Sequence, residues 1–387
     1  MKKQYYYFYD LNEVLIDRYP AKIANKIRNN EPDSNFVFIY SEKQKENQPS
    51  KLPKGSNSFF MPSLNQRKIN QIILEFPPIS LTTIAQRIPD MWMLTLFNHK
   101  KIPTYIVQHG LWSDKLQRVS FHLLLIQKFS KFVSYIKYTS KICNLNKIPL
   151  IGVLIDLYNF LLKEDITIPE TKYLNKDMIR ANKVFAFDQS WDDYYTKKYG
   201  YNINALIYIG NPDFLLLKDI DITKKENSVC YLCQSLVEDG RLPKDIYINF
   251  LKKLANSIPS SKKLYIKLHP RSKIKFYKDL NKYQNIVFTK DLPICEYYVA
   301  HYTGLLATVK QITDNVLIWL LPNHHTPEYF RKFGSIVSSC EKDLYDFVND
   351  EISFKIKSKP MEKNIEKYFN DFDPIGKISQ TLIFNKK

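Results

Sequence analysis

The chain has 387 residues, a length typical of two domains that each bury a core of their own. Apolar residues make up 44% of it and aromatic residues 14%, which excludes a largely disordered protein. Its 57 basic and 39 acidic side chains give a formal net charge of +18. We therefore expect anionic partners, such as nucleotide sugars, acidic glycans, phospholipid surfaces or nucleic acid.

The five cysteines are scattered and odd in number, which favours a reducing compartment over a disulfide framework. Cys230 and Cys233 have the spacing of a redox or zinc pair, but they lie in an apolar stretch without a second ligand pair. We interpret them as buried small side chains. The aromatic run that ends at Asp10 is too short and too polar at its borders for a signal peptide, so we expect a cytoplasmic protein.

Short apolar stretches alternate with helical or loop material in the N-terminal half, a pattern that favours a parallel α/β sheet. We predict the first domain at residues 1–217, a hinge at 218–227 and a second domain at 228–387, whose C-terminal helix packs back on the first. The strands predicted for the first domain are 5–9, 36–40, 91–96, 104–107, 184–187 and 206–209.

Two turns of the first domain carry candidate site residues. Gly110 permits a tight turn after the strand at 104–107, which places His109 on the edge of the sheet where ligands bind. His109 either faces the acceptor or is a turn histidine satisfied by the backbone. Asn211 follows the strand at 206–209 and either lines the donor site or belongs to a simple Gly-Asn-Pro turn.

A basic segment interrupts the first domain at about residues 111–165. From Lys115 to Lys147 it has seven basic and no acidic side chains, interleaved with apolar and aromatic residues. The next stretch, 148–162, is apolar but too short and too interrupted to span a membrane. Two interpretations remain: an amphipathic insert that lies on anionic lipid, and a pair of core helices with a solvated basic face.

Ionisable residues follow two neighbouring predicted strands of the second domain. Glu238, Asp239 and Gly240 come shortly after the strand at 229–232, and His269, Pro270 and Arg271 follow the strand at 264–268. Because ligands of open α/β sheets bind beyond the carboxyl ends of the strands, we expect these groups to face one crevice. A carboxylate and an imidazole there would supply a proton acceptor and a proton donor or phosphate ligand. Each motif alone is also a common turn.

A third motif follows the next apolar run. His301-Tyr302-Thr303-Gly304 stands between a strand at 297–300 and a helix that begins at Leu305. We expect Thr303 to cap that helix, whose free amide groups would then attract a phosphate.

These three motifs in this order resemble the bacterial sialyltransferases and polysialyltransferases, which use CMP-activated donors and have a two-domain GT-B fold. The resemblance covers residues 229–308. It implies that Asp239 is the general base, with Glu238 and Gly240 beside it, and that His269 contacts or protonates the leaving phosphate. It also implies donor and phosphate binding by the residues around His269 and at the helix start, which are Pro270, Arg271, Thr303, Gly304 and Thr308. Where the family has adjacent Ser or Thr residues, this chain has Tyr302-Thr303-Gly304.

The expected chemistry explains these residue types. Transfer from a CMP-linked nonulosonic acid needs a carboxylate to take the acceptor proton and cationic or N–H groups to receive the phosphate. Because imidazole and helix amides can take that charge, we expect no metal or other cofactor. Asp219-Ile220-Asp221 has metal-binding spacing but falls in a polar, linker-like stretch.

The sequence therefore predicts an inverting glycosyltransferase of GT-B type that transfers a sialic-acid-type sugar from a CMP donor to lipopolysaccharide, lipooligosaccharide or capsule glycan. Its expected partners are that donor, a lipid-linked glycan acceptor and an anionic membrane surface, with the protein peripheral on the inner face of the bacterial inner membrane. Three alternatives remain: a transferase for another CMP or CDP donor (Kdo, pseudaminate or polyol phosphate), a non-catalytic capsule-assembly protein, and a nucleic-acid-binding protein. Against the last, we find no zinc-finger spacing and no RNA-binding aromatic signature.

Overall fold

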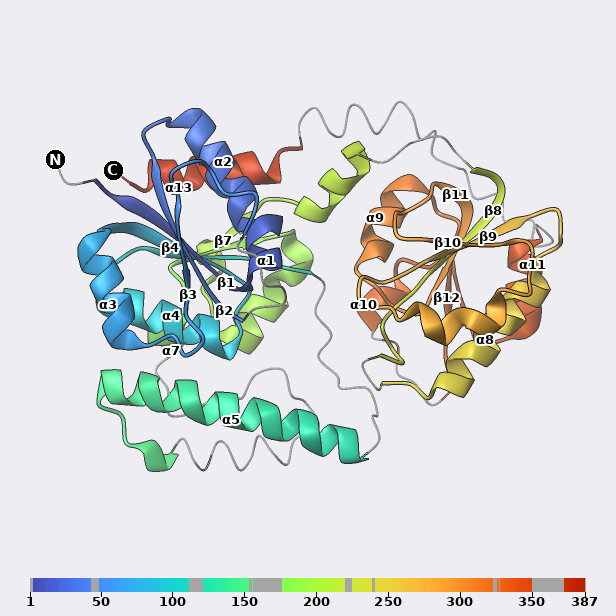
Figure 1. Ribbon diagram of the computed structural model, residues 1–387, viewed down its shortest axis with the longest axis horizontal. Coiled ribbons are helices and arrows are strands. Elements are labelled where there is room, and N and C mark those ends of the chain that lie inside the picture. The colour runs from blue at the N-terminus through green and yellow to red at the C-terminus, as the bar shows by residue number, and fades with distance from the viewer. Residues whose placement is uncertain are drawn as a thin grey trace. The chain divides into compact units, whose positions relative to one another are not determined.

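The computed structural model describes residues 3–42, 49–110, 121–152, 155, 176–219, 225–238, 241–322, 326, 328–349 and 372–386. The chain divides into two compact units (Figure 1). Unit 1 comprises residues 1–109, 129–212 and 370–387, and unit 2 comprises residues 110–128 and 213–369. The division after Pro212 lies upstream of the hinge predicted at 218–227, and the C-terminal residues join unit 1.

Unit 1 contains a seven-stranded sheet in the order β3-β2-β1-β4-β5-β6-β7. Every recorded strand pair in it is parallel. Its strands are β1 (Tyr5–Asn12), β2 (Asn35–Glu42), β3 (Asn57–Phe60), β4 (Pro78–Ile84), β5 (Thr104–Val107), β6 (Lys183–Ala186) and β7 (Leu206–Tyr208).

The two central strands β1 and β2 explain the aromatic runs of the sequence. Residues 6–9 and 36–39 are fully buried, as expected for strands that are covered on both faces. Phe8 and Phe38 stack across the two strands with their ring centroids 5.4 Å apart. These contacts fix the register of the sheet and thereby the position of Asp10, where β1 reaches its carboxyl end.

Helices cover both faces of this sheet, with α2 and α13 on one face and α4 and α7 on the other (Figure 1). The C-terminal helix α13 packs against α2, and Lys26 Nζ lies 2.8 Å from Asp373 Oδ2. The helices of unit 1 are α1 (Glu13–Arg18), α2 (Pro20–Asn30), α3 (Gln66–Glu75), α4 (Ile88–His99), α7 (Lys176–Ile179), α13 (Pro374–Phe384) and most of α5 (Phe121–Asn146). Shorter helical turns are Gln189–Trp191, Tyr194–Lys198 and Ile203–Ala205.

The strand predicted at 91–96 is wrong, because these residues form the middle of α4. The helix begins at Ile88, has a proline in its first turn, and receives a capping interaction in which the Asp90 carboxylate accepts from the Arg87 backbone N–H at 2.8 Å. Burial of residues 91–97 removes the helical periodicity, since an α-helix that is buried all round reads like a buried strand. The strand in this part of the chain is β4, which precedes the helix and was not predicted.

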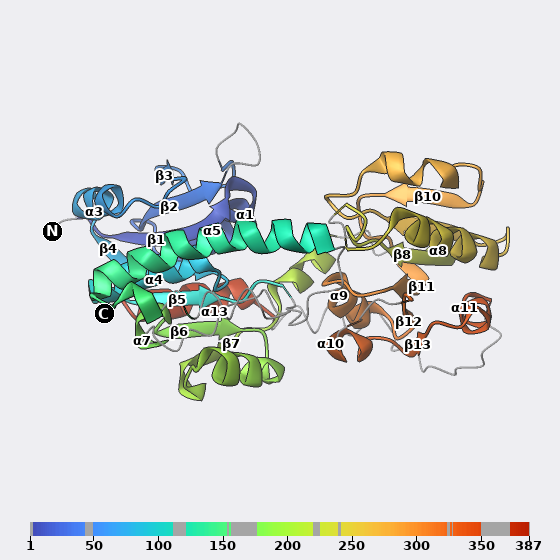
Figure 2. The same ribbon diagram turned by 90° about the horizontal axis from the view of Figure 1, so that it is seen from below.

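Unit 2 contains a six-stranded parallel sheet in the order β10-β9-β8-β11-β12-β13 (Figure 2). Helices α8 and α11 cover one face, and α9 and α10 cover the other (Figure 1). Its strands are β8 (Lys225–Leu232), β9 (Lys263–Lys267), β10 (Ile286–Thr289), β11 (Cys295–Ala300), β12 (Val316–Trp319) and β13 (Ile336–Ser338). Its helices are α8 (Lys244–Ser257), α9 (Leu305–Ile312), α10 (Glu328–Arg331) and α11 (Glu341–Val348), with helical turns at Pro212–Asp219 and Ile274–Leu280.

The cysteines behave as the sequence predicted. All five are free thiols, and Cys230 and Cys233 are buried in the core of unit 2. Burial raises the pKa of Cys233 to about 12, so its thiol stays protonated at neutral pH. These two residues are therefore packing groups beneath the carboxyl edge of the sheet.

The part of α5 that belongs to unit 1 has two different faces. Tyr138, Ile142 and Cys143 are buried, and Lys141 Nζ donates to the Leu64 carbonyl at 3.3 Å. The opposite face exposes apolar side chains at helical spacing, Phe129 at 67%, Val133 at 49% and Ile136 at 38%. Among the helices of the described ranges, none combines the length and the apolarity needed to cross a membrane.

Candidate functional site

The strand order of unit 2 places a ligand crevice at a definite point. The chain runs from β8 outward to β9 and β10, then returns to β11 on the other side of β8. The order of the sheet therefore reverses between β8 and β11, and open α/β sheets bind ligands beyond the carboxyl ends of the strands at such a point. The three predicted motifs follow β8, β9 and β11.

A hydrogen bond joins the loop of the first motif to the loop that follows the second. The Glu238 carboxylate accepts a hydrogen bond from the Lys273 backbone N–H, with Oε1 2.9 Å from the nitrogen. Its other oxygen, Oε2, is buried and has no hydrogen-bond partner among the described residues. Asp239 and Gly240 lie outside the described residues. The loop after β8 is thus anchored to the loop after β9 by Glu238, the direct neighbour of the predicted base.

His269 begins a tight turn directly after β9. Its backbone N–H donates to Ser272 Oγ at 3.1 Å, and the Ser272 N–H donates to the His269 carbonyl at 2.8 Å. The ring atom Nδ1 accepts from the Arg271 N–H at 3.2 Å. A neutral ring in this arrangement carries its proton on Nε2, the atom that would then donate to a leaving phosphate. The exposed Pro270 and Arg271 form the tip of the turn.

The third motif lies at the start of α9. The N-cap residue of α9 is Gly304, which has no capping side chain, so the prediction of Thr303 as the cap is wrong. Thr303 precedes it and is 5% exposed, and its Oγ1 accepts from the Leu305 N–H at 3.4 Å. Beside it, a Cβ added to Gly304 would meet no atom within 4 Å. This open space next to helix amides suits a phosphate. Thr308 differs, because it lies one turn later and is completely buried.

His301 is a structural residue of the same segment. It is 1% exposed, its Nδ1 lies 2.8 Å from the Trp319 carbonyl oxygen, and its ring centroid is 4.8 Å from that of Phe250. The imidazole thus joins the ends of β11 and β12 from inside the core and holds the following Thr303 in place.

The predicted residues of unit 1 also lie at a carboxyl edge. His109 follows β5 and packs edge-on against Tyr19, with ring centroids 5.4 Å apart, and Gly110 has the left-handed φ of +70° that the predicted turn requires. Asn211 follows β7 and is 6% exposed. Gly210 before it has a φ of +83° and its added Cβ would meet Phe372 at 2.3 Å, so this turn is shaped by packing within unit 1.

A charged network that was not predicted from the sequence lies at the reversal point of unit 1, between β1 and β4. The Arg87 guanidinium donates from Nη2 to Asp10 Oδ1 at 2.8 Å and to Asp90 Oδ1 at 2.9 Å, and from Nε to Asp90 Oδ2 at 2.6 Å. Asp10 and Asp90 are 1% and 0% exposed. Asp10 stands in an aromatic run, and Asp90 stands at the start of a helix. The one signal in the sequence that could have indicated the network is therefore the presence of these two acids in apolar surroundings.

Burial dominates the electrostatics of these two acids. It raises the pKa of Asp90 to about 6 against the opposing effect of Arg87, and it also raises the pKa of Asp10. One guanidinium faces two carboxylates, so the network has a formal charge of −1 when both are ionised. The Arg87 guanidinium therefore balances only one of the two buried carboxylates when both are ionised.

Within the described ranges, no group of three or more His, Cys, Asp or Glu side chains is arranged to hold a metal ion. Lys267, at the end of β9, is a further cation of this edge that was not predicted from the sequence. Lys267 Nζ donates to the Leu268 carbonyl at 2.8 Å, and burial lowers its pKa.

No protein-family model and no curated protein matches this sequence. Similar solved structures include the glycotransferase of kitacinnamycin, with a TM-score of 0.56, 7% identity and coverage of 100% of both chains. The UDP-GlcNAc 2-epimerase from Neisseria meningitidis bound to UDP-GlcNAc has a TM-score of 0.55 at 12% identity and covers 99% of both chains. The UDP-GlcNAc 2-epimerase of Methanocaldococcus jannaschii in complex with UDP-GlcNAc and UDP has a TM-score of 0.52 at 12% identity, covering 98% of this chain and 100% of that one. The predicted fold is confirmed: this chain has two Rossmann-like parallel-sheet domains of the GT-B type.

Proposed function

We propose that this protein is a glycosyltransferase that transfers a sialic-acid-type sugar from a CMP-activated donor to a bacterial surface glycan. The observation that carries the proposal is the hydrogen bond from the Lys273 N–H to Glu238, which joins the acidic loop after β8 to the histidine turn after β9. The likeness of the fold to sugar-nucleotide enzymes, and the order of the three motifs, support the same assignment.

The residues divide the reaction between them. Asp239 takes the proton of the acceptor hydroxyl as its oxygen forms the bond to the anomeric carbon of the donor. The bond from that carbon to the CMP phosphate oxygen breaks, and the phosphate receives the electron pair. His269 donates a hydrogen bond or its Nε2 proton to that phosphate, and the amides at the start of α9 hold its other oxygens. Glu238 positions the base, and Thr303 orients the first turn of α9.

Incubating the protein with CMP-, CDP- and UDP-sugars and a glycan acceptor, and measuring nucleotide release, tests this proposal. We expect release from a CMP-nonulosonate that depends on the acceptor, and a loss of about 10² to 10⁴-fold in Asp239→Asn. Retained folding of that variant is the control. Unchanged release in Asp239→Asn would contradict the role of the base.

A second candidate is a sugar-nucleotide epimerase, because two of the similar structures are UDP-GlcNAc 2-epimerases aligned over nearly their whole length. Such an activity needs no acceptor. Conversion of UDP-GlcNAc by the protein alone, followed by separation of the sugar epimers, would favour this candidate over transfer.

We also propose that the exposed face of α5 lies on an anionic membrane where a lipid-linked acceptor is presented. Phe129, Val133 and Ile136 provide apolar contact, and the segment around them is basic without acidic residues. Sedimentation with phosphatidylglycerol vesicles is expected to exceed that with phosphatidylcholine vesicles and to fall in Phe129→Ser/Val133→Ser. Equal sedimentation with both lipids would contradict it.

A further inference from the structure

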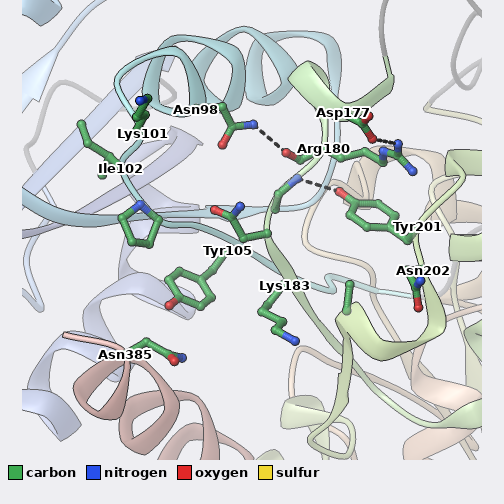
Figure 3. A pocket seen from close by; sticks show the side chains of 14 residues that line it. Asn98, Lys101, Ile102, Tyr105, Asp177, Arg180, Lys183, Tyr201, Asn202 and Asn385 are labelled. Atoms are coloured by element: carbon green, nitrogen blue, oxygen red, sulfur yellow. Dashed lines mark hydrogen bonds and ion pairs between the residues drawn. The ribbon is translucent and has the colours of Figure 1, made fainter. Parts of the chain in front are cut away.

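Unit 1 has a pocket at the edge opposite to the carboxyl ends of its strands. It opens at the amino ends of β5, β6 and β7, beside the end of α4 and the end of α13, and has a volume of about 760 Å³ (Figure 3). This volume lies in the range of sites that enclose small organic ligands, and it is far larger than a single inorganic anion requires.

Two of the amide oxygens around this pocket already accept hydrogen bonds from the protein. Asn182 Oδ1 accepts from the Thr104 N–H at 2.8 Å and from the Thr104 hydroxyl at 3.0 Å. Asn202 Oδ1 accepts from the Asn204 N–H at 2.9 Å. These bonds fix the two side chains and occupy their oxygens. The NH2 group of each side chain is then the part that can donate a hydrogen bond to a ligand.

The charged side chains of the lining add further donors. Lys101, Arg180 and Lys183 contribute three cations, and Asp177 contributes one carboxylate that is ion-paired with Arg180 (Figure 3). Lys183 Nζ donates to the Asn204 carbonyl at 2.8 Å, which holds the ammonium group close to the pocket wall. The lining is therefore net positive and rich in donors, which calls for a ligand rich in anionic and hydroxyl oxygens.

Two tyrosines complete the wall. Tyr105 and Tyr201 line the pocket, and the Tyr201 hydroxyl accepts from the Ala181 N–H at 3.0 Å (Figure 3). The guanidinium carbon of Arg180 lies 5.9 Å from the Tyr201 ring centroid. Tyr105 and Tyr201 are only 3% and 5% exposed, so they give the pocket a rigid wall beside the cations and amides that would contact a ligand.

We propose that this pocket binds an anionic sugar residue, whose carboxylate is attracted by the net positive lining and whose hydroxyls accept from the lining amides. The preference for an anion rests on the pocket itself, whereas the assignment to a glycan rests on the proposed function. The pocket would then hold the acidic glycan at a second point, at the edge of unit 1 opposite to the carboxyl ends of its strands.

Calorimetric titration of the full chain with N-acetylneuraminic acid, without donor or acceptor, tests the proposal. We expect binding at millimolar concentrations that weakens by about tenfold or more in Lys101→Gln/Lys183→Gln. The matched control is Lys22→Gln/Lys68→Gln, which removes the same charge from exposed positions of α2 and α3. It is expected to bind like the unmodified protein.

Three results would overturn the proposal: no binding to the unmodified protein, equal weakening in both double variants, or equally tight binding of inorganic phosphate. Tighter binding of the acid than of neutral N-acetylglucosamine supports it. Because the titration needs no turnover, a failure of the proposed transfer reaction would leave its outcome unchanged, and the two failures are distinguishable.

Discussion

The carboxyl edges of the two sheets differ in how deeply their charged side chains are buried. In unit 1 the reversal point is closed by a buried network in which Arg87 joins Asp10 and Asp90. In unit 2 the equivalent point is bordered by partly exposed loops, where Glu238 and His269 lie and α9 begins beside open space. The same topology therefore holds a buried network of one cation and two acids in one unit and, in the other, partly exposed loops that carry the proposed site.

Removing the cation of unit 1 is expected to have the largest effect on stability. Arg87→Ala leaves two buried carboxylates without their partner, and we expect the free energy of unfolding to fall by about 3 to 5 kcal/mol. Urea denaturation measures it, with exposed Arg67→Ala on α3 as the control, expected within about 0.5 kcal/mol of the unmodified protein. Equal values for the two variants would show that the network is not structural.

The pH dependence of stability sharpens the same point. Burial raises the pKa of Asp90 to about 6 from its usual 3.8, so the folded state binds this proton more tightly than the unfolded state does. The contribution of Asp90 is therefore greatest below the lower value and is lost as the pH rises through the higher one. We expect the stability of the unmodified protein relative to Asp90→Asn to fall by on the order of 2 kcal/mol between pH 4 and pH 7. A relative stability that rises with pH would contradict this.

In unit 2 the anchor between the loops is expected to affect turnover rather than folding. Glu238→Ala removes the acceptor of the Lys273 N–H, a bond worth about 1 kcal/mol, and should lower the rate of sugar transfer about three- to tenfold. Glu238→Gln keeps a carbonyl oxygen at this place and is expected to retain most of the rate. If both variants keep the full rate, the loop contact does not position the base.

The smallest effect is expected at Thr308. Its Oγ1 has no hydrogen-bond partner among the described residues and the side chain is fully buried, so the isosteric Thr308→Val should change the free energy of unfolding by less than about 1 kcal/mol. CMP affinity, measured by titration, should not change, whereas Thr303→Val should weaken it. A loss of affinity in Thr308→Val would return this residue to the phosphate site.

The sequence was sufficient to predict the fold and to locate the loops after β8 and β9, which a hydrogen bond joins in unit 2. The period of apolar runs predicted most central strands, and strand ends then located Glu238, His269 and Thr303. It failed where tertiary burial hides the local pattern, since α4 is apolar all round and was predicted as a strand. It also missed Asp10, Arg87 and Asp90, because a pairing across about eighty residues depends on sheet order rather than on spacing.

Titration with CMP tests most directly whether the nucleotide binds at the carboxyl edge of unit 2. The matched variants are His269→Ala, after β9 of unit 2, and His109→Ala, after β5 of unit 1. We predict that His269→Ala weakens CMP binding by about tenfold or more while His109→Ala leaves it unchanged. Unchanged binding in His269→Ala, or an equal loss in both variants, would contradict the assignment.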